Sequence, residues 1–348
     1  MSQDLPSSNT LISEIRQLID ETRVGVAIAV NASLTLLYWK IGQRLQTEIL
    51  KGERAEYGKE ILATLSQQLT QDYGSGFSYS MLTRMMQFAQ AFPEQAVVVA
   101  LSQALSWSHF KELLPLAQPL QREFYAEMCR VEQWSVRTLR QKIDSMLYER
   151  LALSKQPEEL ARLELQALRE EGKITPGLVL KDPYVLDFLG LQDRYLEKDL
   201  EDAILRDMEA FLLEMGDGFA FLARQKRIQI DNDDFYVDLL FYHRKLRRLI
   251  AVDLKMGEFR AEYKGQMELY LRWLNRYDRQ PGEEAPLGII LCAGKKQEQI
   301  ELLELDRSGI HVAEYLTVLP PREVLQQKLH SAIQQARQRL GAAEEENG

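Results

Sequence analysis

Two apolar segments, residues 235–242 and 246–254, lie on either side of a short basic turn, and each carries one aspartate. Both faces of the first segment are so apolar that it predicts a central strand of a sheet. A carboxylate on such a strand costs free energy unless a cation or strong hydrogen-bond donors meet it. Asp238 lies within this segment and therefore needs a partner.

The turn HRKLRR, residues 243–248, would return the chain as an antiparallel neighbour. Pleat geometry then puts Asp253 and Lys255 on one side of the second strand, because they are two residues apart. If the faces coincide, Asp238, Asp253 and Lys255 converge at one end of the hairpin. An isolated Asp-x-Lys could also be a simple ion pair on a strand.

Two carboxylates beside an ammonium group form a compact Mg²⁺ site, for which Mn²⁺ could substitute. Hard oxygen ligands hold the ion while leaving waters on it, and Lys255 could orient or deprotonate an attacking water or neutralise charge. Phosphodiester hydrolysis needs little more. The chain has no GxxxxGK[ST] or GxSxG motif, so neither ATP hydrolysis nor serine hydrolase chemistry is expected.

The second half predicts a mixed α/β sheet with helices on its faces. The expected elements are a helix at 196–213, strands at 219–230, 235–242 and 246–254, a helix at 262–277, a strand at 287–292, a helix at 297–305, a strand at 311–318 and a helix at 323–340. We place this domain at residues 183–342, before an acidic tail at 343–348 and after a charged helical linker at 154–182.

Residues 1–153 show apolar spacing typical of helices, which predicts a mostly helical domain. A Gly-containing break at 73–78 before another helix has the outline of a helix-turn-helix that would offer Thr83, Arg84 and Gln87 to a groove. Arg84 is its obvious phosphate partner, although core packing also explains the Met and aromatic stripe there. Residues 24–38 are too short and too polar for a membrane span, and we expect a buried helix.

The net charge of −9 argues against a protein that coats nucleic acid through its charge alone. Arg244 and Lys245 in the basic turn could contact phosphate, although a solvated hairpin explains them equally. Cys129 and Cys292 lie far apart outside any metal-binding pattern. With no secretory signal at the start, these features predict a cytoplasmic protein without a disulfide framework.

Gln266 and Tyr270 are four residues apart, so they share a face of the helix that follows the second strand. Here the sequence resembles the PD-(D/E)xK nuclease superfamily, and the helix resembles the QxxxY motif of its RecB-like branch. The segments LEKDLEDAI, FLLEMGDGFAF, ARQKRI, YVDLLFYHR and GQMELYL are similar to the YhcG-type nuclease family. LSWSHF, EFY and WSVRTL resemble that family's own N-terminal domain.

The resemblance covers about residues 10–340 and implies a restriction-endonuclease-like domain behind the helical one, in an α+β two-domain chain. It implies a metal-dependent DNA nuclease whose helical domain directs substrate or partner choice. A catalytically silent nucleic-acid-binding adaptor and an RNA nuclease stay open. A homodimer, and a protein partner from defence, repair or mobile elements, are further expectations, with no membrane association.

The resemblance also implies roles for individual residues. Asp238 and Asp253 would bind the metal, Lys255 would be the catalytic lysine, and Glu201 would be a direct or outer metal contact on the preceding helix. Gln266 and Tyr270 would position the substrate or the lysine, and Gln225 on the first strand is a weaker candidate. Glu197 and Glu214 compete with Glu201 for the role of the helix carboxylate.

Overall fold

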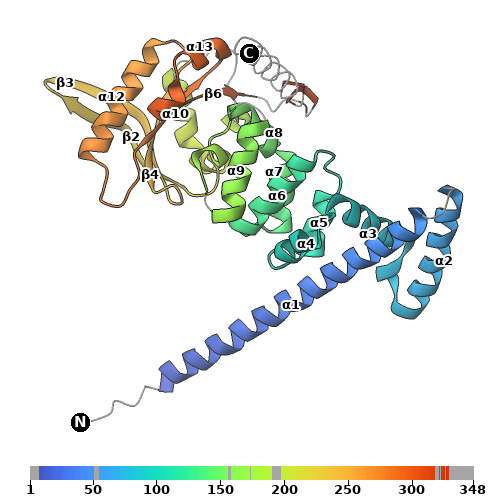
Figure 1. Ribbon diagram of the computed structural model, residues 1–348. Helices are drawn as coiled ribbons and strands as arrows, with labels where there is room; N and C mark the ends of the chain where they lie inside the picture. Colours follow the sequence, from blue (N-terminus) through green and yellow to red (C-terminus); the bar gives the residue numbers. More distant parts are fainter. Residues whose placement is uncertain are drawn as a thin grey trace, which may run out of the picture. The chain divides into compact units, whose positions relative to one another are not determined.

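The computed structural model describes residues 8–50, 55–155, 158–172, 174–189 and 197–317, with short pieces at 321, 323–325 and 327–328. Most of the expected last helix and the whole expected acidic tail lie outside these residues. The chain divides into two compact units, residues 1–145 and 146–348 (Figure 1).

The first unit is helical, as predicted. Its helices are α1 (Ser8–Leu50), α2 (Ala55–Tyr73), α3 (Tyr79–Ala91), α4 (Gln95–Ser102), α5 (Trp107–Leu113), α6 (Pro119–Glu132) and α7 (Val136–Asp144), and a short 3₁₀ turn, η1 (Ser75–Phe77), precedes α3. The Met and aromatic stripe of α3 is core, with Leu82, Met85 and Phe88 fully buried. Gly42 lets α1 approach α3 closely, since a Cβ there would overlap the carbonyl oxygen of Met85.

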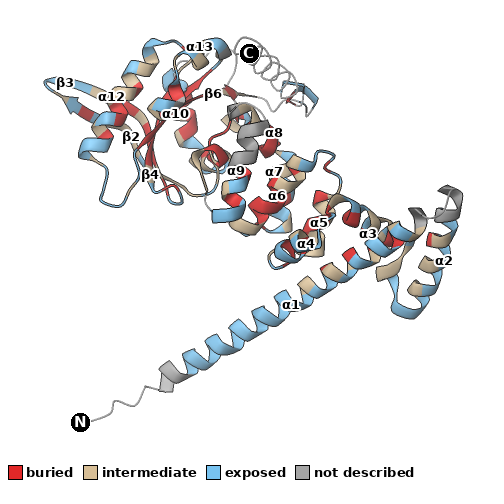
Figure 2. Ribbon diagram, in the orientation of Figure 1, coloured by how far each residue is buried: buried red, intermediate tan, exposed pale blue. Residues whose placement is uncertain are grey.

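The expectation of a buried helix at residues 24–38 is wrong for much of that stretch. Val24, Val26, Val30 and Leu37 of α1 are exposed, and only the later part of the helix packs on its own unit, through residues such as Trp39 (Figure 2). Apolar composition favours burial, but it does not show which surface covers a segment.

The second unit begins with α8 (Leu147–Lys155), which the sequence assigned partly to the first domain. Its buried Arg150 donates to the carbonyl of Pro183 (2.8 Å) and pairs with Glu214, which ties the helix to the second unit. Next come α9 (Glu158–Glu171) and the 3₁₀ turns η2 (Pro176–Leu178) and η3 (Asp187–Leu189). The expected helical linker at 154–182 contains α9, which packs on α8.

The sheet is mixed, as predicted, with strand order β1-β6-β5-β4-β3-β2. Its strands are β1 (Tyr184–Val185), β2 (Phe219–Ile230), β3 (Asp233–His243), β4 (Arg248–Leu254), β5 (Leu287–Cys292) and β6 (Ile310–Leu316). β2, β3 and β4 pair antiparallel, whereas β4, β5, β6 and β1 pair parallel.

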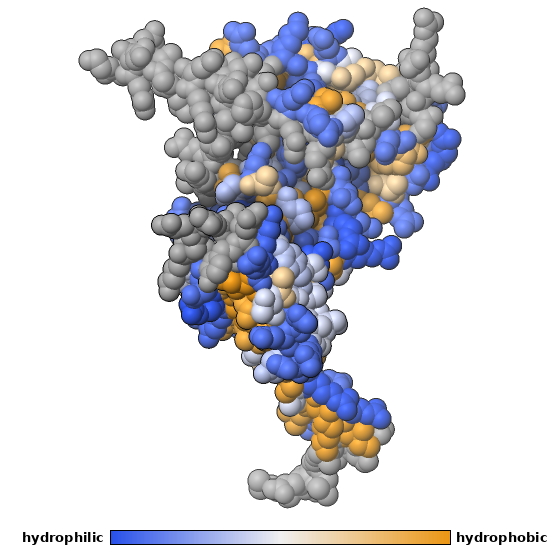
Figure 3. All heavy atoms as spheres, turned by 90° about the vertical axis from the view of Figure 1, so that its right-hand side faces the viewer, coloured by the Kyte–Doolittle hydropathy of each residue, from blue (hydrophilic) through white to orange (hydrophobic). Residues whose placement is uncertain are grey.

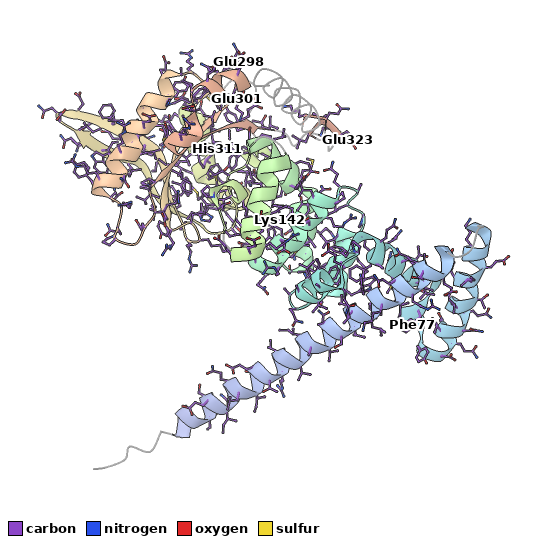
Figure 4. The ribbon with its side chains drawn as sticks, in the orientation of Figure 1. Phe77, Lys142, Glu298, Glu301, His311 and Glu323 are labelled. Atoms are coloured by element: carbon purple, nitrogen blue, oxygen red, sulfur yellow. The ribbon has the colours of Figure 1, made fainter. Side chains whose placement is uncertain are left out.

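Helices cover both faces of the sheet. Residues of α10 (Glu197–Arg206) and α11 (Met208–Met215) pack with one set of strand side chains, and α12 (Glu262–Tyr277) packs with another. A short helix, α13 (Gln297–Leu302), and the 3₁₀ turn η4 (Leu305–Ser308) precede β6. His311 of β6, labelled in Figure 4, contacts the segment before β1. Its Nε2 lies 2.9 Å from the carbonyl oxygen of Lys181.

His243, which opens the basic turn, is buried rather than presented to phosphate. Its Nδ1 accepts from the backbone N–H of Leu246 (3.1 Å), and its Nε2 lies 3.2 Å from the carbonyl oxygen of Asp217. Burial lowers the pKa of His243 to about 4, and the Asp217 carbonyl offsets this only in part. The neutral imidazole of His243 therefore has a structural role.

We expect acid to weaken the fold through His243. The unfolded chain takes up this proton near pH 6.5 and the folded chain only near pH 4. The contribution is therefore complete above pH 6.5 and declines as the pH falls toward 4, by at most about 3 kcal/mol. Urea unfolding at pH 7 and pH 5 should show a smaller loss of stability in His243→Asn than in the parent. An equal loss in both proteins would contradict this role.

Candidate active site

Three polar residues fall at one level of the sheet on adjacent strands. In the β2–β3 ladder Arg224 pairs with Leu239 and Lys226 with Val237, so Gln225 faces Asp238. In the β3–β4 ladder Leu239 pairs with Val252, which puts Asp238 opposite Asp253 where this pairing ends. The sheet register therefore brings an amide and two carboxylates together.

Asp238 is held by a donor on each side. Its Oδ1 accepts from the amide Nε2 of Gln225 (3.0 Å), and its Oδ2 accepts from the backbone N–H of Leu254 (2.9 Å). Because β3 and β4 stop pairing after Val252, the carboxylate takes the place of a main-chain acceptor for Leu254. Gln225 has φ +46°, a left-handed conformation that is uncommon for a residue other than glycine. Strained backbone of this kind is concentrated at functional positions.

Asp253 is the most deeply buried charge of the group, with 2% of its surface exposed. Its Oδ2 lies 3.0 Å from Nζ of Lys255, yet none of the described residues gives that oxygen a well-oriented hydrogen bond. Burial raises the pKa of Asp253 and the negative charge of Asp238 raises it further, whereas Lys255 lowers it. Asp238, Asp253 and Lys255 together carry more negative than positive charge.

Lys255 follows β4 directly, and its backbone N–H donates to the carbonyl of Leu291 on β5 (2.8 Å). Its ammonium lies over the ring of Tyr263, 5.2 Å from the ring centre. Burial lowers the pKa of Lys255, but the carboxylates of Asp253, Glu197 and Asp238 together raise it above the ordinary value. The side chain is a fixed cation beside the two aspartates.

The three candidate helix carboxylates lie in different surroundings. Buried Glu201 on α10 accepts from Gln225 Nε2 (2.9 Å) and from Arg224 Nε (2.6 Å), so one amide joins Glu201 to Asp238. Glu197 accepts from the backbone N–H of Met256 (3.3 Å), beside Lys255.

Glu214 on α11 is engaged elsewhere. It binds Arg150, lies 3.4 Å from Lys181 and accepts from the backbone N–H of Val185 (2.9 Å). These contacts tie α8, β1 and α11 together. The structure thus places Glu201 next to the aspartates and gives Glu214 a structural position.

Gln266 and Tyr270 of α12 meet each other, as their spacing predicts, with the amide Nε2 donating to the tyrosine oxygen (2.6 Å). Tyr270 is buried, which raises its pKa, and the negative charges of Asp253 and Asp238 raise it further. The pair therefore lies within electrostatic reach of the aspartates.

Other expected contacts do not join this site. Arg244 and Lys245 are exposed and follow Asp238 by six and seven residues, at the far end of the β3–β4 hairpin and about 20 Å away along an extended strand. Arg84 belongs to the other unit. Sequence reasoning missed Arg224 and Tyr263, whose roles depend on contacts between distant elements and have no local sequence signal.

The residues present fit a divalent cation held by two carboxylates. Within the described ranges, no group of three or more His, Cys, Asp and Glu side chains could hold a metal on its own. Yet the buried Oδ2 of Asp253 lacks a hydrogen bond and Asp238 lies opposite it, and Mg²⁺ commonly binds to one or two carboxylates plus waters. Glu201 reaches Asp238 only through Gln225, which fits an outer contact.

Comparison with known proteins identifies the family of this chain. Residues 177–330 match the family model of the YhcG PDDEXK nuclease domain, and residues 14–150 match that of the DUF1016 N-terminal domain. The Escherichia coli K12 protein named "Putative nuclease YhcG" is 35% identical over 311 residues, covering 81% of this chain and 82% of the relative. The chain belongs to the YhcG nuclease family.

The YhcG-type resemblance of the sequence is thereby confirmed, as is the PDDEXK fold of the second unit. Solved structures similar to this YhcG-family chain include a repair endonuclease from Pyrococcus abyssi (19% identity, TM-score 0.25, 38% of this chain and 50% of that one). Another is an EndoMS–dsDNA complex (19% identity, TM-score 0.26, 38% and 50%).

Metal binding can be tested without any cleavage assay. We expect Mg²⁺ or Mn²⁺ to raise the Tm of the parent by a few degrees, because an ion that binds only the folded chain stabilises it by mass action. Asp238→Asn and Asp253→Asn should lose this response, and Glu201→Gln should only weaken it. Differential scanning fluorimetry across a metal titration would measure each shift.

Glu214→Gln is the matched control. The same chemical change in the Arg150 network should lower the Tm but leave the metal response intact. Equal metal responses in the aspartate variants and the parent would remove the two aspartates as ligands.

Proposed function

We propose that this protein is a metal-dependent nuclease that hydrolyses phosphodiester bonds in DNA, with the helical unit directing substrate or partner choice. The observation that carries the proposal is the pairing of half-buried Asp238 with buried Asp253, which has the Lys255 ammonium 3.0 Å away. Such a cluster costs stability in the absence of a bound ion, and a function that needs it explains why it is present.

Asp238 and Asp253 would hold the divalent cation, which would polarise the phosphate and make a bound water more acidic. Gln225 and the Leu254 N–H fix both oxygens of Asp238, so its direction is set before substrate arrives. Lys255 would orient the attacking water or balance the charge that develops on the phosphate. Gln266 and Tyr270 would support this arrangement from α12.

In the helical unit, an open hollow of about 800 Å³ supports contact with nucleic acid. It lies among α3, α5 and the start of α6, and its cationic side chains are Arg84, Lys111 and Arg122. Glu112 also lines it, but Arg140 pairs with that carboxylate (2.6 Å). A local positive surface on a chain of net charge −9 suits phosphate groups, and we assign it to substrate contact.

A catalytically silent adaptor is the weaker alternative, since an adaptor would not need Asp238, Asp253 and Lys255 together at this cost. Cleavage assays with both nucleic acids decide whether the substrate is DNA or RNA. A cytoplasmic location, and partners from defence, repair or mobile elements, stay predictions.

Cleavage of supercoiled and linear duplex DNA, single strands and RNA, with Mg²⁺, Mn²⁺ or chelator, tests the activity. We expect chelator to stop cleavage, and Lys255→Ala to lower the rate at least about 100-fold, because it removes a preorganised cation from the developing charge. Lys296→Ala, at an exposed lysine outside the site, should cut like the parent. Cleavage by Lys255→Ala at the parent rate would overturn the site assignment.

The hollow has its own test. Arg84→Glu and Lys111→Glu should weaken DNA binding and make the salt dependence shallower by roughly one phosphate contact each. Their metal response should be that of the parent, because the two aspartates lie in the other unit. Arg137→Glu reverses an exposed arginine outside the hollow and serves as the control. If the control weakens binding as much, net charge rather than the hollow accounts for the effect.

A further inference from the structure

The first part of α1 extends away from the rest of its unit (Figure 1). Every residue from 12 to 30, which we call the exposed stretch, is exposed to solvent (Figure 2). Packing begins at Asn31, whose amide donates to the carbonyl of Leu105 (3.1 Å), and it continues through Trp39, which donates to the carbonyl of Phe92 (2.7 Å). The exposed stretch spans about 28 Å of helix.

The exposed stretch is a poor helix by itself. In proteins, most of the stability of a helix comes from packing of one face rather than from the propensity of its residues. Here the end nearest the domain carries Val24, Val26, Ile28 and Val30 around Gly25, and β-branched residues and glycine are weak helix formers. A helix of this composition needs packing along its side to persist.

Its side chains form an apolar stripe. At 100° per residue, Ile12, Ile15, Leu18, Ile19, Val26 and Val30 fall within an arc of about 120°, whereas Val24 and Ile28 lie on the opposite side. All of them are exposed, Leu18 at 63% of its surface. Figure 3 shows hydrophobic residues gathered along one side of this end of α1 and hydrophilic residues along the other.

The charges beside the stripe point to what covers it. Glu14 and Glu21 are seven residues apart on one flank of the stripe, and Arg16 and Arg23 are seven apart on the other. When two such helices face each other in parallel about a common two-fold axis, the acidic flank of each meets the basic flank of the other. In an antiparallel pair, acidic would face acidic and basic would face basic.

A membrane fits the same helix less well. Residues 12–48 are long and apolar enough to cross a bilayer by length and composition. However, Thr35, Trp39 and Leu45 are buried within the helical unit, and charged residues stand at Arg23 and before it. The uncharged part that stays exposed, residues 24–30, is about 10 Å long, against about 30 Å for the hydrocarbon core.

We propose that the exposed stretch pairs in parallel with the same stretch of a second copy of this chain, forming a homodimer. The proposal stands independently of nuclease activity. In such a dimer both helical units lie at the same end of the helix pair, because the C-terminal ends of two parallel helices lie side by side.

Cysteine cross-linking tests the pairing and its direction. Ile15→Cys on the stripe should form a disulfide-linked dimer under mild oxidation, since equivalent residues of a parallel pair lie together. Ser13→Cys, on the opposite side of the same turn, should not. The native cysteines, Cys129 and Cys292, are buried, so the parent serves as the background. Equal cross-linking at both positions, or none at Ile15, would overturn the parallel pair.

Sedimentation equilibrium of the full chain tests the dimer itself. The parent should be dimeric, and Ile15→Glu with Ile19→Glu should shift the equilibrium toward monomer at least 100-fold. Glu14→Lys with Glu21→Lys should also weaken the dimer, and adding Arg16→Glu with Arg23→Glu should restore it. A monomeric parent would refute the proposal. Protection of the exposed stretch from hydrogen exchange in that monomer would then indicate packing on the second unit. Sedimentation of the chain with phosphatidylglycerol vesicles would instead indicate a membrane surface.

Discussion

The candidate site depends on one hydrogen bond, from the backbone N–H of Leu254 to the Asp238 carboxylate. It forms where β3 and β4 stop pairing, at a point where a main-chain donor would otherwise be unsatisfied in the sheet. Because the Asp238 side chain replaces a backbone acceptor, β3 can stop pairing with β4 at this point. The same hydrogen bond fixes the orientation of the carboxylate. Gln225 completes this arrangement from β2 and links it to Glu201 on α10.

This arrangement concentrates negative charge around the buried carboxylates of Asp253 and Glu201. Asp238, Asp253 and Glu201 are near each other, and the cations in contact with them are Lys255 and Arg224. Lys255 pairs with Asp253 and Arg224 with Glu201, so the charge between the two aspartates is left unbalanced. A buried network that is only partly satisfied is costly, and functional sites are where proteins keep such costs.

The sequence predicted the parts of this site that follow from short-range geometry. Alternation along two strands joined by a short turn brings Asp238, Asp253 and Lys255 together, and helical spacing pairs Gln266 with Tyr270. It could not choose among Glu197, Glu201 and Glu214, because that choice depends on how α10 and α11 lie over the sheet. The buried Arg150 network, which occupies Glu214 and moves α8 into the second unit, is equally invisible in local spacing.

The same limit explains the error at residues 24–38. Apolar composition favours burial, but the helical unit covers α1 only from Asn31 onward. Asp253 Oδ2 has an ion pair with Lys255 but no well-oriented hydrogen bond, and the stripe of α1 has no packing partner among the described residues. Two aspartates that share one ammonium leave room for a further cation. An apolar stripe between opposite charges is matched by the same pattern reversed, which a two-fold axis provides.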